Sequence, residues 1–78
     1  LDIRGMASDE AMIELQRFID SAQLAHLSPV TIIHGKGSGV LRQAVGAYLK
    51  KDRRIASFRP GKYGEGEAGV TVAELKGV

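Results

Sequence analysis

The sequence predicts a single α/β domain with the element order β-α-β-α-β-β. Two stretches with apolar residues at helical spacing alternate with short β-branched runs, and glycines or prolines separate the elements. The 78 residues suffice for one hydrophobic core but not for two. Because right-handed crossovers make the first three strands parallel, we expect a four-stranded, mainly parallel mixed sheet with an antiparallel last strand. Two helices would cover it in a two-layer or sandwich arrangement.

The first strand and the first helix follow directly from residue spacing. Apolar and polar residues alternate in Leu1-Asp2-Ile3-Arg4-Gly5, which is typical of a strand with one apolar face. Residues 8–27 predict a helix, because Ser8 can cap it and acidic residues come next. His26 lies at the end of this helix, where we expect it to serve the last carbonyl groups. The apolar stripe of the helix consists of Ala11, Leu15, Phe18, Ala22 and Ala25, flanked by Met12 and Ile19.

The remaining elements alternate in the same way. Residues 30–33 form a β-branched run that fits a strand covered on both faces. Residues 41–49 repeat apolar side chains at helical spacing and predict the second helix. Residues 54–58 and 70–75 predict the third and fourth strands, and the glycine-rich residues 59–69 between them predict a loop.

Composition excludes several classes of function. The chain has no cysteine, which rules out disulfides, a thiolate nucleophile and a cysteine-based zinc site. No apolar run approaches the roughly 18 residues that cross a bilayer, so we expect no membrane role and a cytoplasmic location. Residues 1–78 contain no internal linker and are expected to form one domain. The chain starts within a strand and without methionine, so we expect it to be a domain of a longer protein.

The net charge of +2 conceals an uneven distribution. Residues 1–33 carry five acidic and two basic side chains, whereas residues 34–62 carry eight basic side chains and one acidic side chain. Residues 63–78 carry three acidic side chains and one basic side chain. A basic middle segment is typical either of a surface that attracts a polyanion or of a solvated helix face.

The segment from His34 to Gly39 predicts a phosphate-binding loop at the start of a helix. Its alternating glycines let a phosphate approach main-chain N–H groups, and Lys36 adds charge. The alternative is a simple strand-to-helix turn. The spacing is not that of a Walker A loop, and Val40 breaks the dinucleotide pattern, so we expect no nucleotide bound by this domain itself. The predicted phosphate-binding residues are Gly35, Gly37, Ser38, Gly39 and Arg42.

Three side chains near this loop are candidates for catalysis together with Lys36. Because histidine can carry and transfer protons, His34 is either a general acid or base or a partner of a carbonyl at the sheet edge. Asp2 and Arg4 share one strand face, either as an internal ion pair or as a phosphate-contacting arginine beside a carboxylate that can hold Mg²⁺ or Mn²⁺. One carboxylate argues against a two-metal cluster, leaving one-metal or metal-independent cleavage.

Further basic side chains follow the second helix and the third strand. They form either a solvated rim or additional phosphate contacts. Phe58 is the only aromatic residue among them in the sequence, so the series of aromatic residues that forms the stacking platform of a single-strand binder is not predicted. The rim consists of Lys50, Lys51, Arg53, Arg54, Arg59 and Lys62.

The motifs Leu1-Asp2-Ile3-Arg4-Gly5 and His34-Gly35-Lys36-Gly37, followed by the closing strand at 70–75, resemble the Smr (small MutS-related) domain over essentially the full chain. Length and pattern are most similar to the C-terminal domain of the second bacterial MutS paralogue. Ile3 replaces the commoner leucine and Ser38 the commoner threonine, and Gly66-Glu67 stands where the family usually has paired glycines. The motif residues that carry over are Asp2, Arg4, His34, Gly35, Lys36 and Gly37, with Arg42 following.

The resemblance implies a DNA-nicking endonuclease that prefers branched or recombination-like structures, in a host protein that suppresses homologous recombination. It also implies a homodimeric host and a monomeric isolated domain. Other family members act on RNA or at stalled ribosomes, so a non-catalytic nucleic-acid or ribosome-binding module is the main alternative. A protein-interaction appendage is the third. Cleavage would use Arg4, Lys36 and the amides after Gly37 to stabilise charge, with His34 transferring protons.

Overall fold

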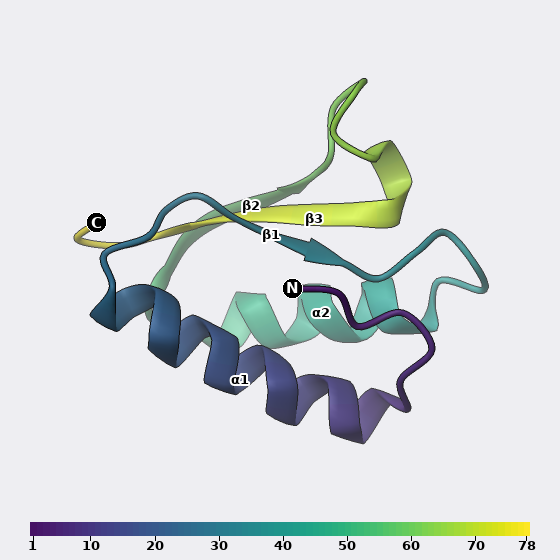
Figure 1. The fold of residues 1–78 in the computed structure, drawn as a ribbon, viewed down its shortest axis with the longest axis horizontal. Coiled ribbons are helices and arrows are strands. Elements are labelled where there is room, and N and C mark those ends of the chain that lie inside the picture. The colour runs from purple at the N-terminus through teal and green to yellow at the C-terminus, as the bar shows by residue number, and fades with distance from the viewer.

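Two helices lie side by side against one face of a three-stranded sheet (Figure 1). The computed structural model describes all residues from Leu1 to Val78. The elements in chain order are α1 (Ser8–Leu24), β1 (Val30–Ile33), α2 (Val40–Lys51), β2 (Ile55–Pro60), the 3₁₀ turn η1 (Glu67–Gly69) and β3 (Val70–Leu75). The α/β class and the two-layer arrangement are therefore confirmed. Neither helix has the length and apolar composition needed to cross a membrane.

The sheet differs from the prediction in strand number and pairing. Its order is β1-β3-β2, and β3 is antiparallel to both neighbours, so β1 and β2 share a direction without touching. The predicted four-stranded, mainly parallel sheet is wrong. The handedness of a crossover sets the relative direction of the two strands that it joins. It does not determine whether a third strand lies between them in the sheet. All β3 residues except Glu74 are buried, and such a strand belongs at the centre of a sheet.

The predicted first strand is reduced to one parallel bridge between Asp2 and Ile33. The amide of Ile3 donates to the carbonyl of Ile33 (2.9 Å), and the amide of Ile33 donates to Leu1 (2.7 Å). Ile3 is fully buried, so its side chain anchors this short segment beside the end of β1. This pairing places Asp2 and Arg4 next to the residues that follow β1.

One core fills the space between the helices and the sheet. It is built from the predicted stripe of α1, the inner side chains of α2 and alternate strand residues. Phe18 is only partly buried, and Ala25 lies outside the core because α1 ends at Leu24 instead of continuing to residue 27. The largest fully buried side chains are Ile3, Leu15, Ile19, Ile32, Leu49 and Val45.

Candidate functional site

His34 directly follows β1 and is nearly buried, with 6% of its surface exposed. Its Nδ1 lies 2.9 Å from the Gly35 carbonyl oxygen, which can only accept, so Nδ1 carries a proton. Its Nε2 lies 2.9 Å from the Thr71 hydroxyl oxygen on β3. The carbonyl contact, one of the two roles left open by the sequence, is therefore present. Both ring nitrogens are engaged, so proton transfer by His34 requires one of these bonds to open.

The backbone on either side of His34 is tied to the start of β3. The amides of His34 and Gly35 both donate to the carbonyl oxygen of Gly69, at 3.1 and 2.9 Å. Gly69 and Thr71 were not predicted as site residues. The signal in the sequence is slight: Thr71 is the polar residue on the inward face of a strand, where a buried hydroxyl needs a partner.

The loop after His34 carries a series of unsatisfied backbone donors. The amides of residues 36–39 donate no hydrogen bond within the protein, and neither do those of Leu41 and Arg42 in the first turn of α2. Gly39 adopts a left-handed conformation (φ 85°) and begins the helix without a side-chain cap. Because α2 has no acidic residue in its first turn, its positive dipole end is not neutralised. This loop has the properties of an anion-binding site.

Asp2 and Arg4 form a two-pronged ion pair at the side of this loop. Arg4 Nε lies 3.0 Å from Asp2 Oδ1, Arg4 Nη2 lies 2.7 Å from Oδ2, and the Arg4 amide also donates to Oδ1. Hydrogen bonds from the side chain and then the amide of Arg4 lower the pKa of Asp2 to about 2. The Arg4 methylenes lie against Gly35, where an added Cβ would be 3.4 Å from Cγ. Asp2 therefore orients Arg4 across the loop.

Lys36 extends towards η1. Its Nζ lies 3.8 Å from a carboxylate oxygen of Glu67 in η1, and both side chains are exposed. Glu67 has a positive φ of 51°, which glycine adopts without strain. The departure from paired glycines noted in the sequence thus places a carboxylate beside Lys36.

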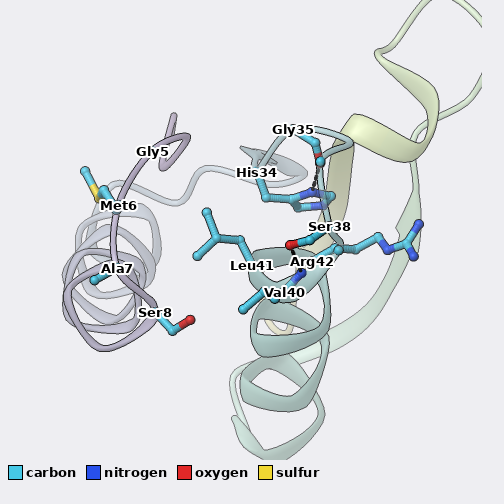
Figure 2. Close-up of a pocket in the computed structure, with 12 residues that line it drawn as sticks. Gly5, Met6, Ala7, Ser8, His34, Gly35, Ser38, Val40, Leu41 and Arg42 are labelled. Carbon is cyan, nitrogen blue, oxygen red and sulfur yellow. Dashed lines mark hydrogen bonds between the residues drawn. The ribbon is translucent and has the colours of Figure 1, made fainter.

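A groove of about 450 Å³ lies between the loop and the segment that enters α1 (Figure 2). Its walls are Gly5–Ser8 on one side and His34 to Arg42 on the other, so the N-terminal ends of both helices face it. Asp2, Arg4 and Lys36 are adjacent to the loop but do not line the groove. The contribution of residues 5–8 was not predicted, because only the pairing of Ile3 with Ile33 brings that segment here.

The predicted basic rim is not a single surface. Lys50 and Lys51 end α2, and its 12 residues separate them by about 18 Å from the loop at its start. Arg54 forms ion pairs with Asp52 and Asp20 and contacts the Tyr48 hydroxyl. These contacts join α1, α2 and the start of β2. Arg59 pairs with Glu65 (2.9 Å). Arg53 and Lys62 form no ion pair.

The donor set at Asp2 does not fit a resident divalent metal. Both carboxylate oxygens already accept hydrogen bonds from Arg4. No group of three or more histidine, aspartate or glutamate side chains gathers anywhere in the chain. Mg²⁺ and Mn²⁺ take several oxygen ligands, so metal binding through Asp2 alone stays a prediction.

Comparison with known proteins identifies the family. The family model of the Smr domain matches residues 1–76. The chain is 55% identical over 76 residues to the endonuclease MutS2 of Caldicellulosiruptor bescii, covering 97% of this chain and 10% of that protein. It is 54% identical over 76 residues to the Bacillus cytotoxicus protein of the same name, again covering 97% of this chain and 10% of the relative. The chain therefore spans about a tenth of the length of these relatives.

Solved structures agree with this assignment. The Smr domain of Thermus thermophilus MutS2 superimposes with a TM-score of 0.95 at 41% identity, covering 97% of this chain and 95% of that one. The stand-alone small MutS-related protein YdaL of Escherichia coli shares the fold, with a TM-score of 0.91 at 23% identity over 96% of this chain and 62% of that one. The two motifs, which meet beside the end of β1, and these matches show that the chain belongs to the Smr domain family.

Proposed function

We propose that this domain is a phosphodiester hydrolase that nicks DNA, with branched or recombination-intermediate DNA as its substrate. The observation that supports it is the loop of residues 36–42, whose unpaired amides line a groove and lie beside Arg4 and Arg42. A phosphodiester placed there would receive several N–H donors at once. Similarity to proteins named endonuclease MutS2 supports the same reaction.

Each residue then has a defined task. Water attacks phosphorus, and negative charge grows on the non-bridging oxygens before the bond to the leaving sugar oxygen breaks. The loop amides and Arg4 stabilise that charge, and losing one such donor costs about 100- to 1,000-fold in rate. Asp2 holds Arg4 in place through two hydrogen bonds. His34 moves protons after releasing either Thr71 or Gly35.

Nicking of supercoiled plasmid tests this proposal. Wild type is compared with Asp2→Asn, Arg4→Ala and His34→Ala, each with and without Mg²⁺ or Mn²⁺. Lys50→Ala is the matched control, because it removes a cation at the far end of α2. We expect nicking by wild type and the control and a large loss in the other variants, after circular dichroism has shown that each is folded. Equal nicking by all proteins contradicts the assignment. Branched DNA, linear duplex and structured RNA in parallel identify the substrate.

We propose that the chain is the C-terminal part of a homodimeric protein that suppresses homologous recombination, and that the isolated domain is monomeric. The lengths of the relatives are consistent with a longer host.

A second function is favoured by one observation. Both ring nitrogens of His34 are occupied by protein partners, which suits a loop that grips phosphates without cutting them. The domain would then be a nucleic-acid or ribosome-binding module acting on RNA or stalled ribosomes. Salt-sensitive binding with no cleavage of any substrate would identify it.

A further inference from the structure

A second cavity adjoins the phosphate groove on the side of β2. Its volume is about 360 Å³, and Arg42 lines both it and the groove. Thr71, which bonds to His34, also lines it, so the cavity lies one side chain away from the loop. The remaining lining residues come from α2 and from the end of β2: Gln43, Gly46, Phe58, Arg59 and Pro60.

An aromatic ring lies in this cavity. Phe58 is paired with Ala73 and faces α2, but 37% of its surface remains exposed. The opposing helix position is Gly46, where an added Cβ would be 3.9 Å from the ring atom Cε2. The absence of a larger side chain there keeps the ring accessible. The tertiary structure therefore places an accessible ring in the same cavity as Arg42, which the sequence did not predict.

Arg42 and Arg59 also line the cavity, and Arg59 directly follows Phe58 on β2, so its side chain leaves the opposite face of the sheet. Arg42 forms no ion pair, and Figure 2 shows it directed away from the Gly5–Ser8 wall of the groove. Arg59 is fixed by Glu65 (2.9 and 3.3 Å) and by the Pro60 carbonyl (3.1 Å). Arginine planes and aromatic rings both stack on bases, and the Gln43 amide adds hydrogen-bonding groups.

We propose that this cavity is a nucleobase subsite. An unstacked base, from a strand whose phosphate lies on the 36–42 loop, enters the cavity and stacks on Phe58 next to Arg42. This inference rests on the phosphate site of the proposed function. It adds the kind of nucleic acid that the site selects. A base held in a duplex stack cannot enter, so the subsite favours single-stranded, flapped or branched nucleic acid over uninterrupted duplex.

The test compares two strands of equal charge. One is a labelled thymidine oligomer of about ten nucleotides, and the other has the same backbone with every base removed. We expect residues 1–78 to bind the thymidine strand at least about fivefold more tightly by fluorescence anisotropy, because each stacked base contributes roughly 1–3 kcal/mol. Phe58→Leu, which keeps apolar volume, should abolish the preference without weakening binding of the abasic strand.

Further variants distinguish the contribution of the Phe58 ring to binding from that of the residues around it. Phe58→Trp should keep the preference and, because the chain has no tryptophan, its fluorescence should change when the thymidine strand binds. Gly46→Leu should remove the preference by filling the cavity, and leucine is a better helix former than glycine, so the fold is retained. Tyr63→Ala is the control, since this aromatic side chain is 94% exposed and lines no part of the cavity.

Each outcome distinguishes the subsite from the phosphate site. Equal binding of both strands by wild type, with strong salt dependence, overturns the subsite and leaves the phosphate site standing. If the domain binds neither these two strands nor any other nucleic acid, both the subsite and the phosphate site are overturned. A preference lost in Tyr63→Ala but kept in Phe58→Leu also overturns the assignment to this cavity.

Discussion

At the residue scale, the site depends on a few side chains that hold backbone in place. His34 is the main example, because it connects the Gly35 carbonyl to Thr71 and so fixes the loop to β3. Asp2 does the same for Arg4. His34 and Asp2 were both predicted from the sequence, but Thr71 and Gly69, the distant partners of His34, lie more than thirty residues away from it and were not.

His26 adopts a left-handed conformation (φ 56°) at the end of α1. Its backbone amide donates to Gln23 and that of Leu27 to Ala22, which is the hydrogen-bond pattern of a helix C-terminus that prefers glycine. The predicted role at the last carbonyls is therefore carried by the main chain. We expect His26→Gly to raise the free energy of unfolding by up to about 1 kcal/mol in urea denaturation. Gln23→Gly, inside the helix, should lower it by a similar amount; a loss of stability in His26→Gly contradicts this explanation.

Glu67 combines a left-handed backbone with a carboxylate 3.8 Å from Lys36. Glu67→Gly should therefore stabilise the fold and strengthen DNA binding, since it relieves the backbone and frees Lys36 for phosphate. Glu67→Gln separates the two effects: affinity should rise while stability stays unchanged. Denaturation and anisotropy measure them independently. Unchanged affinity in both variants would show that Lys36 does not contact DNA.

At the element scale, α1, α2 and β2 are joined at the end of the molecule opposite the loop. Arg54 bridges Asp20 on α1 and Asp52 at the end of α2, and Tyr48 donates to Asp52 (3.0 Å). The sequence predicted each helix from its apolar spacing. It could not predict this contact, because Asp20 and Arg54 are brought together only by the packing of the two helices.

Arg54→Met tests this cluster. The Asp52 side chain is only 7% exposed, and removing its partner leaves a carboxylate with too few donors. We expect a loss of about 1–3 kcal/mol in the free energy of unfolding at pH 7. Arg53→Met, at an arginine without an ion pair, is the matched control and should change stability little.

The same cluster predicts a pH dependence. Hydrogen bonds from Arg54 lower the pKa of Asp52 to about 2 in the folded protein, below its usual value of 3.8. A depressed pKa contributes stability above the unfolded value, and that stability is lost as the pH falls from about 4 towards 2. Wild type should therefore lose more stability than Arg54→Met between pH 5 and pH 2 in urea denaturation. Parallel curves would contradict the role assigned to this ion pair.

At the scale of the whole molecule, the positive charges of residues 34–62 lie near the end of β2 and near both ends of α2. Only those near its start lie beside the groove. Arg42→Ala should therefore weaken DNA binding and reduce the slope of log affinity against log salt by about one. Lys50→Ala, at the far end, should change neither quantity. Equal effects of both variants would indicate diffuse attraction to the entire basic segment.

The sequence by itself determined the α/β class, both helices, three of the strands and the two motifs that face each other, because these follow from local spacing and backbone preferences. The family resemblance drawn from those motifs was confirmed. Only the tertiary structure decided that β3 lies between β1 and β2, that His34 is bonded on both nitrogens, and that Phe58 lies beside Arg42. The physical reason is that strand order and contacts between distant residues depend on which buried surfaces pack together. The hydrophobic effect depends on the apolar area that is buried and not on how far apart the residues lie in the sequence.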